Sequence, residues 1–323
     1  MSKRLDKRPG YAYFEKYRWV DYFELLCISN IDGELDKTTM IDRIYLKEKD
    51  GIDSGLGESE EFDVDEESTS ESDNELRFYE YYKYFQQRHH QFGDFYPFQV
   101  DDNKLKLKDD YATNNKQIIY TYLLCCSSLS YFKDFQNVLT SDFENISSKA
   151  LARMFPENIT HVLGKSSIGG IRKYKGNVYS KLETLADDLS ANLRISQEDF
   201  AATSSGDGGL DIISWYGFHD NLNSIPTFSC QCKCSTSWTS SSDPGSLLSG
   251  YFDMDCNPFS IYFIPFSFRK VNGNWHQIQH VKNKVLLDRL RICNLLDGQE
   301  DVFMTMRAKT KIEEFILEKQ NVI

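Results

Sequence analysis

Apolar residues recur at helical spacing in several segments of the first half of the chain. Such segments are found at 17–28, 36–46, 76–90, 116–132 and 141–155. A pattern of this period predicts amphipathic helices. Ser141 is the expected N-cap of the last of them, and Pro156 would end it. The first half is therefore predicted to be helical.

The pattern changes in the second half of the chain. A helix is expected over 178–193, where apolar residues again recur at helical spacing. Short apolar runs at 210–215, 226–234 and 260–268 predict three strands. An amphipathic helix is expected over 281–296, after a turn at 272–274. Strands mixed with helices in this order predict a compact α/β unit.

Charge is concentrated in one segment. The 323 residues carry a net charge of −12, and ten of the 18 residues at 58–75 are acidic while none is basic. The remainder of the chain therefore carries a net charge of −2. Since like charges repel and the segment has little apolar surface, a disordered linker or loop is expected over 51–76. An acidic arm that mimics DNA is the alternative, and the EF-hand pattern of a calcium loop is missing.

Composition limits the class of protein. The chain is 40% apolar, which excludes a disordered protein. Its longest strongly apolar run, at 118–126, has about half of the roughly 20 residues that a membrane span needs. No secretory pattern is seen at the N-terminus, so the eight cysteines are expected to be reduced thiols in a cytoplasmic protein without a membrane partner.

The segment CQCKC at 230–234 falls in one of the predicted strands. Side chains alternate in a strand, so the three cysteines would share one face while Gln231 and Lys233 share the other. Asp211 opens the preceding predicted strand, directly after the glycine-rich stretch 206–209. If the two strands are neighbours, Asp211 lies beside Gln231 and Lys233. Carboxylate and amide oxygens suit Mg²⁺, and a lysine stabilises charge at phosphorus, so a phosphodiester-hydrolysing site is predicted.

The combination of GDGGLD at 206–211 and QCK at 231–233 resembles the PD-(D/E)xK nuclease superfamily, in the Mrr-like restriction endonuclease variant with Gln in place of the acidic residue. The resemblance covers roughly residues 170–300. It implies an α/β (α+β) fold in which a restriction-endonuclease-like core has a central mixed sheet flanked by helices. It also implies Asp211 and Gln231 as ligands of Mg²⁺, with Mn²⁺ as a substitute, and Lys233 as the catalytic lysine.

In this family a glutamate on the helix before the first catalytic strand often joins the metal ligands. Glu183 is the expected counterpart, with Asp187 one helical turn later as the alternative, and Asp207 is expected to be a loop residue. Contacts to substrate are expected from the glycine-rich loop and from the basic end of the chain. The residues concerned are Ser205, Gly208, Gly209, Lys282 and Arg289.

The expected function is that of a Mg²⁺-dependent endonuclease that hydrolyses DNA, as an effector of bacterial defence against foreign DNA. The expected domains are an N-terminal helical segment (1–50), the acidic linker (51–76), a helical region (77–165) and the nuclease domain (166–323). Partners would be DNA and, through the helical half, a second copy or another protein. The alternative is a nuclease-fold scaffold that binds DNA or a partner protein without cutting.

Each site residue also has a structural interpretation. Asp211 would be a turn carboxylate, Gln231 would bridge strands, and Lys233 would extend from a strand edge into solvent. Glu183 would be a solvated helix residue, and Lys282 and Arg289 would lie on a solvated helix face. A zinc site at the cysteines is disfavoured, because side chains at i and i+2 of a strand are roughly 7 Å apart while two zinc-bound sulfurs lie closer to about 4 Å apart.

Overall fold

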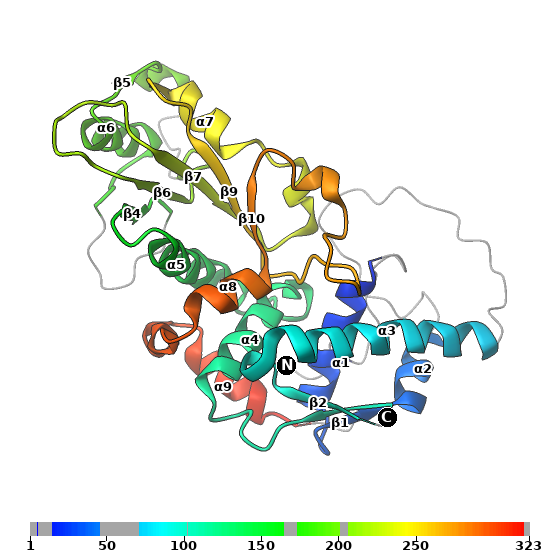
Figure 1. The fold of residues 1–323 in the computed structure, drawn as a ribbon. Coiled ribbons are helices and arrows are strands. Elements are labelled where there is room, and N and C mark those ends of the chain that lie inside the picture. Colours follow the sequence, from blue (N-terminus) through cyan, green and yellow to red (C-terminus); the bar gives the residue numbers. More distant parts are fainter. Residues whose placement is uncertain are drawn as a thin grey trace. The chain divides into compact units, whose positions relative to one another are not determined.

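The computed structural model describes residues 5, 15–45, 71–101, 103–164, 173–200 and 206–319. The chain divides into two units (Figure 1). We call the first the helical unit; it comprises Met1–Gln136, Phe266–His276 and Thr310–Ile323. The second, the sheet unit, comprises Asn137–Pro265 and Gln277–Lys309. The boundary thus falls at residue 137 rather than at 166, and two segments from the second half of the chain belong to the helical unit.

The predicted helices of the first half are present. In the helical unit these are α1 (Lys16–Ser29), α2 (Lys37–Tyr45), α3 (Glu71–Phe92) and α4 (Asn115–Cys126), followed near the end of the chain by α9 (Lys309–Leu317). Helix α3 begins at Glu71, so residues 71–75 of the acidic segment are helical instead of linker. The rest of the acidic segment, 58–70, lies outside the described residues.

The helical unit also contains a small sheet that the helical prediction for the first half missed. Strands β1 (Glu34–Asp36), β3 (Lys104–Leu107) and β2 (Phe98–Asp101) pair antiparallel in that order. In β3, Leu105 and Leu107 are buried while the two lysines are exposed, which is the period-2 pattern of a half-buried strand. The run is only four residues long, so the neighbouring helical periodicity obscured it.

A five-stranded mixed sheet forms the centre of the sheet unit. Its order is β10 (Val285–Leu287), β9 (Phe259–Phe263), β7 (Thr227–Cys232), β6 (Ile212–Trp215) and β4 (Ile159–Val162). β6 is antiparallel to both of its neighbours, β4 and β7, whereas β7, β9 and β10 run parallel to one another. Strands β5 (Asn192–Leu193) and β8 (Phe252–Asp253) form a separate antiparallel pair. The predicted α/β class with a mixed sheet flanked by helices is confirmed (Figure 1).

Helices cover the sheet. Helix α6 (Val178–Leu189) buries Leu182 and Leu185 against Ile213 of β6, in a cluster that also contains Leu248 of α7 (Pro244–Tyr251). Helix α5 (Gln136–Met154) precedes Phe155, whose ring stacks on Phe228 of β7 at 4.3 Å between centroids. Phe228 and its β7 neighbours at even spacing, Cys230 and Cys232, share a face by strand alternation, and Gln231 belongs to the other face.

Two predicted helix boundaries are wrong. Helix α5 begins at Gln136, so Ser141 lies inside it and is not the N-cap. The helix expected over 281–296 is instead strand β10 followed by α8 (Arg289–Leu296). Asp288 separates the two, because its side chain accepts a hydrogen bond from the Arg291 backbone N–H and thereby starts the helix. A short buried apolar run has the same composition in a strand as in a helix, and only its pairing with β9 decides.

No helix among the described residues combines the length and the apolar character that crossing a bilayer requires.

Candidate active site

The β6–β7 ladder brings the two parts of the sequence motif together. Ile212 pairs with Cys230, and the Asp211 backbone N–H continues the ladder by donating to the Cys230 carbonyl at 3.2 Å. One step beyond the Ile212–Cys230 pair, Asp211 therefore stands opposite Gln231 on the same face. The strands are neighbours, as the sequence analysis required.

The Asp211 carboxylate lies in an unfavourable electrostatic position. One of its oxygens, Oδ2, accepts a hydrogen bond from the Cys232 backbone N–H at 2.7 Å. Burial and the adjacent Asp207 carboxylate raise the pKa of Asp211 to about 7, although the Cys232 N–H and the Lys233 ammonium act in the opposite direction. A carboxylate that is costly to ionise next to a second carboxylate is typical of functional sites.

Gln231 is buried with one half of its amide unused. Its Nε2 donates to the Gly209 carbonyl at 2.9 Å, and the side chain is only 3% exposed. Its Oε1 is buried without a hydrogen-bond partner. An amide oxygen in that state costs free energy of about 1–3 kcal/mol unless something else binds it. Together with the Asp211 carboxylate, it forms a pair of hard oxygen ligands.

Two lysines border this end of the sheet. Lys233 continues β7 by donating its backbone N–H to Phe263 at 2.9 Å, and its ammonium is near enough to lower the pKa of Asp211. Lys181 of α6 is buried, and its Nζ donates to the carbonyls of Gly206 and Leu163 at 2.7 and 3.1 Å. Sequence analysis missed Lys181, although a lysine within the apolar stripe of a helix was a visible signal.

The glycine-rich loop is shaped by its backbone. Gly208 and Gly209 have φ of +66° and +81°, in the left-handed region that favours glycine. Their carbonyls accept hydrogen bonds from the Tyr251 hydroxyl, at 2.8 Å, and from Gln231. The two glycines thus position the loop, and the proposed contacts to substrate from them stay predictions. Ser205 lies outside the described residues.

Glu183, the acid expected at the site from α6, lies on the side of the helix that faces away from Asp211. Glu183 and Asp187 are exposed, whereas Lys181 of the same helix is buried against the glycine-rich loop. Residues two positions apart on a helix differ by about 200° in direction, so Glu183 faces away from the loop that Lys181 contacts. The structure does not bring Glu183 or Asp187 to Asp211.

A different glutamate approaches the site from α5. The half-buried Glu144 carboxylate packs against Gly164, where a side chain would require this carboxylate to move. Gly164 follows β4, next to Leu163, whose backbone N–H donates to the Asp211 carbonyl at 2.9 Å. Burial and then the charges of Asp211 and Glu144 raise the pKa of the Cys232 thiol. The two acids therefore lie near the same thiol, although 67 residues of sequence separate Glu144 from Asp211.

The two basic residues expected at the substrate have different surroundings. Arg289 is fully buried, and its Nε donates to the Pro265 carbonyl at 2.8 Å, so the expected contact with a phosphate is wrong. The guanidinium instead satisfies a backbone carbonyl beside β10. Lys282 is exposed, and its contact to substrate stays a prediction.

The side chains suit a hydrated metal ion. Within the described parts of the chain, no group of three or more His, Cys, Asp or Glu residues is arranged to hold a metal, which leaves the cysteine zinc site unsupported. Mg²⁺ binds through one or two carboxylates and several waters. Asp211, with a raised pKa, and the buried Gln231 Oε1, without a partner, fit such an ion. No more than these few protein ligands are needed.

Comparison with known proteins gave no match to a family model, a curated protein or a solved structure. The resemblance to the PD-(D/E)xK superfamily therefore rests on the motif itself.

Proposed function

We propose that the protein is a Mg²⁺-dependent endonuclease that hydrolyses phosphodiester bonds in DNA. The observation that carries the proposal is the opposition of Asp211, whose pKa is raised to about 7, to Gln231, whose buried Oε1 has no hydrogen-bond partner. Lys233 follows directly on the same strand. A carboxylate, an amide oxygen and an ammonium at one strand end suit a phosphate group with its metal ion.

The roles follow from the chemistry of each side chain. Asp211 and Gln231 would hold Mg²⁺, which would neutralise phosphate charge and lower the pKa of bound water. The Lys233 ammonium would lie at the scissile phosphate and stabilise the negative charge that develops there. Glu144 of α5 would take the place first given to Glu183, because it lies near Cys232, whose backbone N–H donates to Asp211. A proton on Asp211 would leave when the cation binds.

Plasmid cleavage tests the assignment. The full chain should nick supercoiled plasmid in Mg²⁺ or Mn²⁺ and lose this activity in EDTA. Asp211→Asn and Lys233→Ala should each reduce the cleavage rate by roughly 100-fold or more, as the loss of a charge-stabilising group does. Asp220→Asn and Lys175→Ala are matched controls, because both residues are exposed on the sheet unit. Equal cleavage by wild type and both site variants would refute the assignment.

A second candidate function is a scaffold that binds DNA or a partner protein without cutting. The observation in its favour is Gln231 itself, because a neutral ligand binds a cation more weakly than a carboxylate does. Calorimetric titration with Mg²⁺, alone and with duplex DNA, separates the two functions. Heat of binding that disappears in Asp211→Asn favours the nuclease, whereas no binding under either condition favours the scaffold.

The biological role we propose is bacterial defence against foreign DNA, which is the role suggested by the motif's resemblance to Mrr-like restriction endonucleases. Transformation efficiency of cells expressing the protein measures it. Wild type should lower the yield of transformants relative to Lys233→Ala, and equal yields with a range of foreign DNAs would argue against this role.

A further inference from the structure

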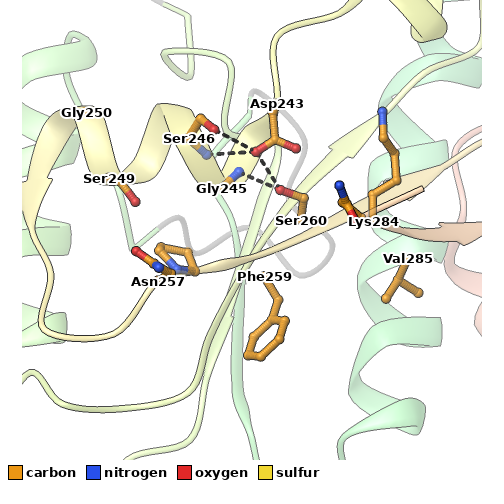
Figure 2. A pocket seen from close by; sticks show the side chains of 12 residues that line it. Asp243, Gly245, Ser246, Ser249, Gly250, Asn257, Phe259, Ser260, Lys284 and Val285 are labelled. Atoms are coloured by element: carbon orange, nitrogen blue, oxygen red, sulfur yellow. Dashed lines mark hydrogen bonds between the residues drawn. The ribbon is translucent and has the colours of Figure 1, made fainter. Parts of the chain in front are cut away.

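The sheet unit has a polar cavity of about 920 Å³ at the end of the sheet where β9 and β10 begin (Figure 2). It is lined by Asp243, by one side of α7 from Gly245 to Gly250, and by residues 257–260 and 283–285. Gln231 pairs with Tyr262, near the other end of β9, so the cavity lies away from the Asp211 site. Its volume is in the range of small-molecule binding sites, about 300–1,000 Å³.

Asp243 brings a fixed negative charge into this cavity. Its Oδ1 accepts three hydrogen bonds, from the Ser246 backbone N–H at 2.9 Å, the Ser246 hydroxyl at 3.0 Å and the Ser260 hydroxyl at 2.7 Å (Figure 2). Burial opposes ionisation, but the hydrogen bonds from Ser260 and Ser246 lower the pKa of Asp243, so it is ionised at neutral pH. No described residue donates to its other oxygen, Oδ2, which leaves one carboxylate oxygen for a ligand.

Lys284 brings the opposite charge into the same cavity. Its Nζ lies 4.6 Å from the centroid of the Tyr262 ring, and it forms no salt bridge to Asp243 or to any other described carboxylate. Two further amides line the cavity, those of Asn257 and Asn283, and both residues are exposed. Asn283 has a φ of 59°, in the left-handed region, which is uncommon and is tolerated best by residues such as Asn.

The Asp243 carboxylate and the Lys284 ammonium line one cavity without a salt bridge between them. Such an arrangement favours a ligand that has both hydrogen-bond donors and acceptors on one edge. We propose that this cavity binds a guanine nucleotide through the edge of its base. The free Oδ2 of Asp243 would accept from both the ring N–H and the exocyclic amino group, and the Lys284 ammonium would donate to the neighbouring carbonyl. Carboxylates accept from base amino groups and lysines donate to guanine O6 in nucleic-acid recognition. Asn257 and Asn283 would bind sugar or phosphate oxygens.

The base could come from a free nucleotide or from a nucleic acid, and the chemistry is the same in both. Helix α7 separates the cavity from the glycine-rich loop. Residues of α7 that do not line the cavity contact this loop, as the Tyr251 hydroxyl does by donating to the Gly208 carbonyl. Binding in the cavity therefore needs neither Asp211 nor hydrolysis. The proposal depends on the proposed nuclease function only if the base belongs to substrate DNA.

Calorimetric titration of the full chain in EDTA with dGMP and dTMP tests the proposal. Since dTMP has no exocyclic amino group, dGMP should bind at least about tenfold more tightly. Asp243→Asn keeps Oδ1 to cap α7 while removing the charge, and Lys284→Met keeps the aliphatic length of the side chain. Each should weaken dGMP binding by about tenfold or more. Asp220→Asn and Lys175→Met should leave it unchanged.

Single-stranded oligonucleotides with one guanine or one thymine in an otherwise identical sequence distinguish the two sources of the base. Preference for the guanine oligonucleotide that depends on Asp243, without binding of dGMP, supports a base within nucleic acid. Guanine binding that survives both cavity variants overturns the proposal, as does the lack of a guanine preference in both arms. Asn257→Ala, at an exposed position, serves if a cavity variant does not fold, and should weaken guanine binding.

The double variant Asp211→Asn/Lys233→Ala separates this proposal from the nuclease. It should bind dGMP as wild type does, even if it cuts no DNA. Loss of dGMP binding in this variant, with the fold intact by circular dichroism, would place the nucleotide at the Asp211 site and overturn the assignment to the cavity.

Discussion

Each unit of the protein holds a cluster of charged side chains, and the two clusters differ in burial and in how well their carboxylates are satisfied. In the helical unit, Arg88 donates to both Asp21 and Glu24, at 2.7 and 2.8 Å. Ser127 donates to the second Asp21 oxygen, and Tyr96 and Tyr120 donate to Glu24. Every carboxylate oxygen of this cluster accepts at least one hydrogen bond.

The sheet unit shows the opposite. Asp211 lies beside a second carboxylate, its pKa is raised to about 7, and the Gln231 Oε1 next to it is buried without a partner. A buried polar group without compensation lowers stability, and the Arg88 Nε of the helical unit is also buried without a hydrogen-bond partner; the sheet unit differs in that its unsatisfied oxygen lies beside a carboxylate with a raised pKa. We therefore interpret the cluster of the helical unit as structural, and we propose that the cluster of the sheet unit binds a ligand.

The largest expected effect tests the structural cluster. Arg88→Met leaves two buried carboxylates without their cation, and should lower the free energy of unfolding by about 3–5 kcal/mol. Urea denaturation followed by circular dichroism measures it. Lys83→Met is the matched control, because Lys83 is exposed on the same helix, and its effect should stay within about 0.5 kcal/mol. A small loss for Arg88→Met would show that the cluster contributes little.

The second prediction concerns pH. Because the pKa of Asp211 in the folded protein is about 7, against 3.8 ordinarily, the folded state keeps a proton that the unfolded state loses between these values. The free energy of unfolding should therefore fall as pH rises from about 4 to 7. Asp211→Asn removes this loss, and at pH 8 in EDTA it should be more stable than wild type by up to about 4 kcal/mol. Urea titrations at pH 4.5 and 8 measure the difference, and parallel pH profiles would contradict the shift.

The third prediction separates stability from activity at Gln231. Gln231→Met removes the unpartnered Oε1 and also the Nε2 that donates to the Gly209 carbonyl, so the free energy of unfolding should change by no more than about 1 kcal/mol. Plasmid cleavage should nevertheless fall by at least about tenfold. Gln117→Met is the control, since Gln117 of the helical unit is also buried with an Oε1 that lacks a hydrogen-bond partner. If both variants cut like wild type, Gln231 is a structural residue.

The smallest effects distinguish the two glutamates. Glu144→Gln should reduce cleavage several-fold or more, because its carboxylate lies near Cys232 and Gly164. Glu183→Gln and Asp187→Asn should leave the rate within about twofold and the stability within about 0.5 kcal/mol, as exposed positions do. A loss of cleavage for Glu183→Gln alone would restore the original assignment.

Much of the local structure was predictable. Helices α1, α2, α3, α4 and α6 and strands β6, β7 and β9 fall where the apolar periodicity placed them. Residues 281–296 did not, because the three apolar residues of β10, two of them buried, fit a strand and a helix equally well until β9 pairs with them. The burial of Arg289 was equally hidden, since a basic residue on a predicted amphipathic helix is usually solvated.

The sequence by itself determined that an acid and a Gln-x-Lys pair lie on consecutive strands, because strand periodicity and a glycine turn are local properties. Only the tertiary structure decided which other groups join them. Glu144, Lys181 and Gly164 meet this end of the sheet through contacts between residues far apart in the chain. The face that each helix presents depends on the sheet it covers, and no local pattern specifies that choice.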